Sequence, residues 1–206
     1  MGVVSGIVSV IRYDVTAKGQ SNHAGTTMME NRRDALVGMS KLIVAAEEDA
    51  RRLSDTLVFT VGKMQVLPGQ ENVIPGEVKA TFEMRHMDKA VTDRFYDDIR
   101  QMAAGIPNCD FEFVPTVAKY STPCDERLVK LIDGVCAEMS VSHVVMPSGA
   151  GHDANPMAHE GVPMGMIFAP SAGGISHHGA EYTEPRHVDM GADVLYRTVL
   201  KLDEEG

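Results

Sequence analysis

Tryptophan is absent from this chain of 206 residues, and cysteine is scarce. The three cysteines, Cys109, Cys124 and Cys136, stand apart from one another and form no Cys-x-x-Cys pair. This spacing argues against a disulfide framework and against a zinc site built from thiolates. Free cysteines fit a reducing compartment, so we predict a cytoplasmic protein.

Basic residues are also in deficit, with 19 Lys and Arg against 29 Asp and Glu and a net charge of -10. Binding to a nucleic acid backbone depends on a basic surface that displaces counterions, so no nucleic acid partner is expected. No segment approaches the roughly 20 apolar residues that cross a bilayer. No membrane association is therefore predicted.

The remaining composition is that of an ordinary globular protein, with 44% hydrophobic and 23% charged residues. A chain of this length forms one large domain or two small ones. Methionine is frequent, at 14 residues. Because the methionines are scattered along the chain, we interpret them as adaptable core residues and not as metal ligands.

Two periodicities divide the first part of the chain into elements. Apolar residues alternate with polar ones in four segments and recur every three or four residues in two others, which predicts strands and helices. The resulting order is strand, helix, strand, strand, helix, strand. This order is typical of a ferredoxin-like sandwich, in which two helices cover one face of a four-stranded antiparallel sheet. The predicted elements are residues 3–17, 31–52, 57–67, 77–87, 89–104 and 109–118.

The pattern changes after Pro123, where helices and short strands alternate. Such alternation predicts part of an α/β domain with a parallel sheet. Two strands make a poor sheet by themselves, so this second unit is expected to be incomplete. We therefore predict two domains, residues 1–118 and 119–206. The predicted elements of the second are residues 125–139, 143–147, 163–171 and 187–203.

Three histidine-bearing loops are rich in glycine or small residues. His23 lies in SNHAG, His152 in SGAGHDA, and His177 with His178 in GGISHHGAE. Glycine-rich loops at the ends of strands are where α/β folds place ligands. A single loop histidine is more often just solvated or hydrogen-bonded. Three such loops in one chain favour a functional site.

A complete metal site is not predicted from these residues. His177 and Glu181 have the spacing of two ligands on one helical turn, but the glycines around them argue against a helix. The chain has no HExxH motif, no HxH motif and no carboxylate cluster. Any metal ion would need further ligands from residues outside this chain.

Two polar residues have an ordinary and a functional interpretation. Arg85 ends a predicted strand, where it either forms a surface ion pair or binds a carboxylate through its planar guanidinium group. Asn72 lies in the loop PGQENVIPG, where asparagine usually caps its own backbone turn. The residue types alone do not decide between these alternatives.

Five motifs together resemble the hydantoinase/carbamoylase family of metal-dependent amidases. They are SNHAGTTMMENRRDAL, TVG with ENVIPGEV, FEMR, PSGAGHDA and MIFAPSAGGISHHGAEYT. That family includes N-carbamoyl-L-amino acid hydrolases, allantoate amidohydrolases and β-ureidopropionases, and it is related to the aminoacylases. The resemblance extends over nearly the whole chain but covers only the second half of the family's longer proteins.

The resemblance implies a division of labour between the two predicted domains. Residues 1–118 are similar to a lid domain that also forms a homodimer, and residues 119–206 to the C-terminal portion of a catalytic domain. The implied reaction is metal-dependent cleavage of the C–N bond of N-carbamoyl amino acids or related ureido acids. Two divalent ions per site are implied, as Zn, Mn, Ni or Co, and we expect this half alone to be inactive.

The resemblance also implies roles for individual residues. His23 matches a lid histidine that stabilises negative charge on the substrate oxygen in the partner subunit's site. Asn72 and Arg85 match residues that hold the substrate carboxylate. His177 matches the last metal ligand, and His178 is an outer neighbour.

The backbone from Gly149 to Gly151 is similar to a segment that lines the substrate pocket. For His152 and Asp153 two roles stay open: they either shape the turn or support the metal ligands without contacting the metal ion. Two positions depart from the family pattern. Met28 stands where proline is usual, and Glu83 stands where aspartate is usual.

Three hypotheses for the chain remain at this point. It is a fragment or truncated product of a longer amidase, which we favour, or one subunit of a split enzyme whose other half is supplied in trans. The third possibility is a non-catalytic module for dimerisation or binding.

Overall fold

The structure, a computed structural model, describes residues 1–205. It divides into two compact units, Ser9–Ser121 and a second that joins Met1–Val8 to the chain from Thr122 onward. The sequence-based division had placed residues 1–118 together. The first eight residues instead cluster with the C-terminal unit.

The predicted strand at residues 3–17 is wrong in one respect, because it is two strands that belong to different sheets. β1 spans Gly2–Ile7 and β2 spans Val10–Lys18. Between them the buried Ser9 donates two hydrogen bonds to the carbonyl of His86, from its amide at 3.0 Å and from its hydroxyl at 2.9 Å. Residues of β1 are buried on both faces, whereas β2 alternates, but Val and Ile continue through the junction, so the apolar pattern did not reveal the break.

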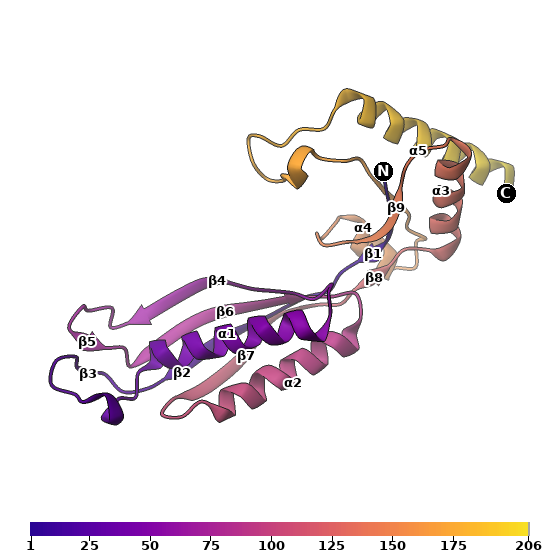
Figure 1. Cartoon of the computed structure of the whole chain (residues 1–206). Coiled ribbons are helices and arrows are strands. Elements are labelled where there is room, and N and C mark those ends of the chain that lie inside the picture. The colour runs from indigo at the N-terminus through magenta and orange to yellow at the C-terminus, as the bar shows by residue number, and fades with distance from the viewer. Residues whose placement is uncertain (206) are drawn as a thin grey trace. The chain divides into compact units, whose positions relative to one another are not determined.

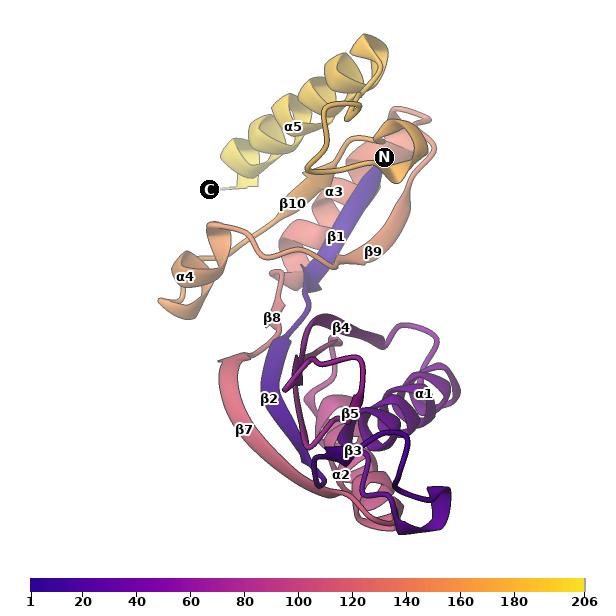
Figure 2. The ribbon, with the colours of Figure 1, turned by 90° about the vertical axis from the view of Figure 1, so that its left-hand side faces the viewer.

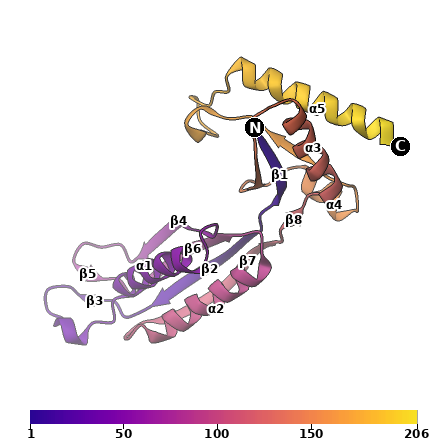
Figure 3. The ribbon, with the colours of Figure 1, turned by 45° about the vertical axis from the view of Figure 1, so that its right-hand side comes forward.

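The unit Ser9–Ser121 is the expected ferredoxin-like sandwich. Its sheet has the strand order β4-β6-β2-β7, and every neighbouring pair is antiparallel. Helices α1 and α2 cover one face of this sheet (Figures 1 and 3). The prediction for this unit is therefore confirmed. Besides β2, its main elements are α1 (Ala35–Leu53), β4 (Val58–Leu67), β6 (Glu77–Arg85), α2 (Lys89–Gly105) and β7 (Asp110–Lys119).

Strand β6 shows how the sheet separates its two faces. Its even-numbered residues, from Val78 to Met84, are buried in the core under the helices. Its odd-numbered residues, which include Glu83 and Arg85, lie on the opposite face, which carries no helix, because side chains alternate along a strand. Charged side chains can lie on this face at little cost in free energy, because no helix covers it and removes them from water. The helix-free face is thus where this unit can present ligand-binding groups.

Side-chain caps fix where the two long helices begin. Asp34 accepts hydrogen bonds from the amides of Leu36 and Val37 at the start of α1, and Asp88 accepts one from Ala90 at the start of α2. An aspartate cap contributes about 1 kcal/mol to helix stability.

The second unit is organised around β1. Strand β9 (Val144–Ser148) pairs with it in parallel, whereas β8 (Thr122–Pro123) and β10 (Met166–Phe168) pair with it antiparallel. The sheet is therefore mixed, where the sequence had suggested a parallel one. Helices α3 (Glu126–Glu138), α4 (Ala154–His159) and α5 (Pro185–Glu205) complete the unit, and Figure 2 shows α3 beside β1 and β10.

Several short features were not predicted, among them β8 and α4. β3 (Asn22–His23) and β5 (Val73–Ile74) form a two-stranded ribbon, and 3₁₀ turns lie at Met29–Asn31 and Ala172–Gly174. Two- and three-residue elements are too short to show a periodicity. Among residues 1–205, no helix is long and apolar enough to cross a membrane.

Candidate functional site

The β3–β5 ribbon brings together two residues that the sequence singled out. His23 is the cross-strand partner of Val73, and the amide of the next residue, Ala24, donates to the carbonyl of Asn72 at 2.9 Å. Both His23 and Asn72 are exposed. The ribbon therefore places the backbones of these two exposed residues next to each other at one end of the sheet.

Hydrogen bonds within the loop after β3 fix the state of the His23 ring. Its Nδ1 accepts a hydrogen bond from the amide of Gly25 at 3.0 Å, which requires that this nitrogen carry no proton. The neutral tautomer then carries its proton on Nε2. Arg32 secures the loop through hydrogen bonds to the carbonyls of Thr27 at 3.1 Å and Ala24 at 2.6 Å. His23 is thus an ordered N–H donor.

Two glycines allow the ribbon to pack against the sheet. A Cβ atom at Gly19 would lie 2.0 Å from the carbonyl oxygen of Arg33, and one at Gly76 would lie 2.3 Å from Oγ of Ser21. The amide of Gly19 also donates to the carbonyl of Gly76 at 2.8 Å. Any side chain at these positions would push the ribbon away.

Arg85 lies at the other end of the same sheet. It is the last residue of the nine-residue strand β6, which begins at Glu77, and such a strand is roughly 26 Å long. The β3–β5 ribbon lies beyond the Glu77 end, since Gly76 meets Ser21 there. Within one copy of the chain, the structure therefore does not bring Arg85 together with His23 and Asn72.

Glu83 holds Arg85 in an ion pair. Its Oε1 accepts hydrogen bonds from Nε of Arg85 at 2.7 Å and from Nη2 at 2.6 Å, while Oε2 accepts one from Arg12. Burial raises the pKa of the Glu83 carboxyl, but the hydrogen bonds from the two arginines outweigh burial and lower the pKa below its ordinary value. Arg85 therefore forms the ion pair that is usual for an arginine at the end of a strand. Its side chain is still 29% exposed.

The loop after β9 carries Gly149 and Gly151, both exposed. Buried Ser148 organises this loop. Its hydroxyl donates to the carbonyl of Ala150 at 3.0 Å and lies 2.7 Å from Nε2 of His152. His152 therefore shapes the turn, one of the two roles left open for it. Added Cβ atoms at the two glycines would meet no atom within 4 Å, so open space adjoins them.

His177 has an unusual backbone. It lies in the exposed loop between Ala172–Gly174 and α5, and its φ of 55° is in the left-handed region that non-glycine residues rarely adopt. Its amide donates to Oε2 of Glu181 at 2.8 Å. This hydrogen bond holds the loop in a conformation that costs about 1 kcal/mol or more. Local strain of this kind is frequent at ligand-binding residues.

The His, Cys, Asp and Glu side chains of residues 1–205 do not form a complete metal centre. Across residues 1–205, no group of three or more His, Cys, Asp or Glu side chains is placed to hold a metal ion. Protein metal sites of the catalytic type use about three protein ligands. His177 can therefore supply one ligand, and the others would have to come from outside this chain.

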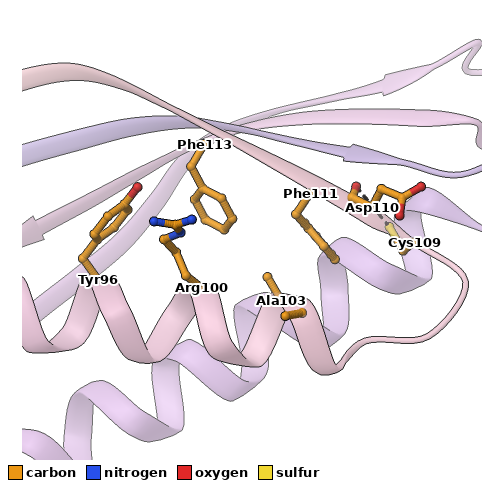
Figure 4. A pocket seen from close by; sticks show the side chains of 8 residues that line it. Tyr96, Arg100, Ala103, Cys109, Asp110, Phe111 and Phe113 are labelled. Atoms are coloured by element: carbon orange, nitrogen blue, oxygen red, sulfur yellow. Dashed lines mark hydrogen bonds between the residues drawn. The ribbon is translucent and has the colours of Figure 1, made fainter.

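A groove on the first unit is lined by none of the predicted site residues. A groove of about 480 Å³ lies between α2 and β7, with Arg100 and Tyr96 on the helix facing Phe111 and Phe113 on the strand (Figure 4). The Cys109 thiol lies at one end, and burial raises its pKa, which keeps it protonated. The groove is thus on the helix-covered side of the sheet, away from Glu83 and its arginines.

Residues 11–201 match peptidase family M20/M25/M40, and the chain belongs to this family. Its relatives identify the branch. The chain is 39% identical over 203 residues to allantoate amidohydrolase from Escherichia coli (strain K12), a match that covers 95% of this chain and 48% of the relative. It is 34% identical over 205 residues to N-carbamoyl-L-amino acid amidohydrolase from Geobacillus stearothermophilus, covering 98% of this chain and 50% of that enzyme.

Solved structures agree with this branch. A hydantoinase/carbamoylase family amidase from Burkholderia multivorans superposes with a TM-score of 0.88 at 33% identity, covering 96% of this chain and 49% of that one. The resemblance found in the sequence is confirmed. The chain spans about half the length of the curated relatives that it matches.

Sequence reasoning missed Arg12 and Ser148. The position of Arg12 beside Glu83 is visible only when β2 and β6 are aligned, because the alignment makes the two residues cross-strand partners. Ser148 directly precedes the glycine-rich turn and is an ordinary residue by type. Its burial, which the sequence did not show, gives it the central position in that loop.

Proposed function

We propose that this chain is the C-terminal half of a metal-dependent amidohydrolase that cleaves the C–N bond of N-carbamoyl amino acids or related ureido acids. The observation that carries the proposal is the 39% identity to an allantoate amidohydrolase over nearly the whole chain, at half the relative's length. The unit Ser9–Ser121 is the lid and dimerisation domain in this account. The unit from Thr122 onward is a portion of the catalytic domain.

His23 is proposed as the residue that stabilises negative charge on the substrate oxygen. Attack on an amide or carbamoyl carbon places this charge on oxygen, and an N–H donor aimed at it lowers the barrier. The neutral His23 ring has such a donor at Nε2, because Nδ1 is occupied by the amide of Gly25. Exposure of the ring leaves this donor accessible.

The substrate carboxylate is proposed to lie between Arg85 and Asn72. These residues are at opposite ends of one sheet, so one copy of the chain is not expected to bring both to the same substrate. A twofold dimer solves this problem if Arg85 serves the site of its own subunit while His23 and Asn72 reach the partner's site. This arrangement predicts two equivalent sites per homodimer.

His177 is proposed as one ligand of a divalent ion, and backbone from Gly149 to Gly151 as part of the pocket wall. The ions, when bound, supply Lewis-acid activation of the substrate carbonyl and of water. Imidazole and carboxylate ligands accept Zn, Mn, Ni and Co alike. The remaining ligands belong to the half that this chain lacks.

Reconstitution tests the proposal. The part of Escherichia coli allantoate amidohydrolase that this chain does not match is produced separately, mixed with this chain and Mn²⁺, and assayed for release of ammonia from allantoate and from N-carbamoyl amino acids. We expect turnover from the mixture and none from either part alone. Turnover by this chain alone would contradict the proposal.

The same assay addresses the alternatives. Activity in the mixture supports a fragment or a subunit of a split enzyme, since both need a second half. A mixture that forms a stable complex and binds substrate without turnover would favour a binding module.

A further inference from the structure

We propose that the groove between α2 and β7 binds a small aromatic monocarboxylate, with Arg100 as the residue that holds the carboxylate. The groove belongs to the unit Ser9–Ser121 and shares no residue with the candidate site, so the inference goes beyond the proposed function and does not depend on it. The walls of this α2–β7 groove come from one helix and one strand (Figure 4). They include Tyr96, Arg100, Ala103 and Ala104 on α2 and Phe111 and Phe113 on β7.

Small side chains opposite large ones keep the groove open. Ala103 and Ala104 lie three and four residues after Arg100, and so on the same side of α2. Phe111 and Phe113 are two residues apart on β7, and their rings therefore share one face of the strand. The helix thus places methyl groups where a larger side chain would fill the space. The resulting volume of about 480 Å³ is of the size that holds a small molecule.

The aromatic part of the wall is fixed before any ligand binds. The ring of Tyr96 stacks on that of Tyr13, with 4.2 Å between the ring centres and 10° between the planes. The ring of Phe113 meets Tyr96 edge to face at 6.2 Å and 87°. Because these rings hold one another in place, an aromatic ligand can pack against them at a small cost in conformational entropy.

Aromatic residues are scarce elsewhere in the chain. It has 5 Tyr and 6 Phe, so three of its eleven aromatic residues line this one groove. All three are only partly buried. Partly buried aromatic rings around a hollow are typical of ligand pockets and not of a closed core.

Arg100 supplies a positive charge that lacks an ionic partner. Its guanidinium carbon lies 5.8 Å from the centre of the Tyr96 ring, and its side chain is exposed. Among residues 1–205 no carboxylate forms an ion pair with Arg100, whereas Arg94 on the same helix pairs with Asp98 at 2.9 Å. A planar guanidinium group next to an aromatic ring can bind both oxygens of a carboxylate.

The acidic groups near the groove do not neutralise Arg100. Asp110, at one end of the groove, is paired with Arg33 at 2.8 Å. The Cys109 thiol at the same end is protonated, because burial raises its pKa. Asp97 is three residues before Arg100 on α2, but within the described chain the two residues form no ion pair. One uncompensated positive charge beside aromatic rings suits an aromatic molecule with one negative charge.

Fluorescence titration of the whole chain with 2-naphthoate tests the inference. The chain has no tryptophan, so naphthalene emission is measured without a tryptophan background. The uncharged 2-naphthamide has the same ring system and is the ligand control. We expect saturable binding of the acid, about tenfold or more tighter than that of the amide, because only the acid forms an ionic hydrogen bond with Arg100.

Variants of α2 locate the binding site. Arg100→Gln should weaken binding of 2-naphthoate by about tenfold or more, and Arg100→Lys, which keeps the charge without the planar fork, should lie between Arg100→Gln and wild type. Ala104→Leu places a larger side chain in the groove and should weaken the acid and the amide alike. Position 104 is exposed and helical, so leucine is compatible with folding there.

Arg94→Gln is the matched control, because Arg94 is on the same helix but is paired with Asp98 and does not line the groove. It should bind 2-naphthoate within about twofold of wild type. Circular dichroism establishes that each variant is folded before its affinity is compared.

Each outcome decides between the proposed ligand and its alternatives. Unchanged affinity in Arg100→Gln overturns the carboxylate contact, and unchanged affinity in Ala104→Leu overturns the location in the groove. Absence of saturable binding by the wild-type chain overturns the whole inference. Sedimentation tests whether a second copy of the chain covers the groove instead. We expect the same mass for wild type and Ala104→Leu, and a lower mass for Ala104→Leu would overturn the ligand site in favour of such an interface.

Discussion

His23 lies opposite Val73 in the β3–β5 ribbon, so the exposed residues His23 and Asn72 form a group with adjacent backbones, although α1 and β4 separate them in sequence. Three contacts position this group. They are the Ala24 to Asn72 backbone hydrogen bond, the Arg32 bonds to the loop carbonyls, and the glycine contacts under the ribbon. The ribbon is therefore a preformed part of the candidate site.

Replacement of Gly76 by alanine should displace the ribbon. The new Cβ would lie 2.3 Å from Oγ and 2.7 Å from the amide of Ser21. We expect Gly76→Ala to lower the free energy of unfolding in urea by about 1–3 kcal/mol. Gly62→Ala is the control, since its Cβ would meet nothing within 4 Å and should cost less than about 0.5 kcal/mol. Equal stability of the two variants would contradict the close contact between Gly76 and Ser21.

Loss of the Ser148 hydroxyl should loosen the glycine-rich loop. Ser148→Ala removes hydrogen bonds to Ala150 and His152 from a buried position, which should cost about 1–3 kcal/mol. Hydrogen exchange at the amide of Ala150 should accelerate. Ser40→Ala, which removes an exposed hydroxyl bond to the α1 backbone, serves as the control and should leave that amide unchanged. An unaltered exchange rate in Ser148→Ala would argue against a structural role for this serine.

His177→Gly should separate stability from function. Glycine adopts a φ of 55° without strain, so we expect the free energy of unfolding to stay constant or rise by up to about 1 kcal/mol. Activity of the reconstituted enzyme should be lost together with the metal ligand. His178→Gly is the control, because the ring of His178 accepts a hydrogen bond from Ala180 at 3.1 Å and its backbone is not strained, so stability should fall. A large loss of stability in His177→Gly would contradict the interpretation that the left-handed backbone of His177 costs free energy.

Glu83 should make stability depend on pH in the acid range. Its pKa in the folded protein is lowered below the ordinary 4.5, so its contribution is fully present above that value and is lost as the pH falls through the lower folded pKa. Glu83→Gln should therefore destabilise the chain by about 1 kcal/mol at neutral pH, and the difference should shrink below pH 4.5. Urea unfolding at a series of pH values measures this.

Glu112→Gln provides the comparison for that series. Glu112 also pairs with a basic residue on this sheet, Lys18, but both side chains are more than half exposed. Its replacement should change stability little at any pH. A pH profile of Glu83→Gln that runs parallel to wild type would contradict the shared ion pair.

The sandwich could be predicted because its strands and helices are long enough to show their periods. Phe82 and Met84 alternate with Glu83 and Arg85, and this alternation alone identifies β6 and its two faces. The break at Ser9 was missed, because Val and Ile continue from β1 into β2 and no glycine or proline lies between the two strands.

The candidate site could be predicted only in part. Residue type and motif resemblance identified His23, Asn72, Arg85 and His177. The pairing of Arg12 with Glu83 depends on strand register, which a sequence pattern fixes only when the neighbouring strand is known. The separation of Arg85 from His23 likewise appears only when the length and direction of β6 are known.

Mixing two inactive variants tests most directly whether His23 serves the partner's site. His23→Ala and His177→Ala forms of the reconstituted enzyme are prepared separately, then mixed under conditions that exchange subunits. A heterodimer of the two then has one site with both His177 and the partner's intact histidine loop. Activity of about one quarter of wild type is predicted, because half of the dimers are mixed and each has one intact site. A mixture that stays inactive after subunit exchange would contradict the account.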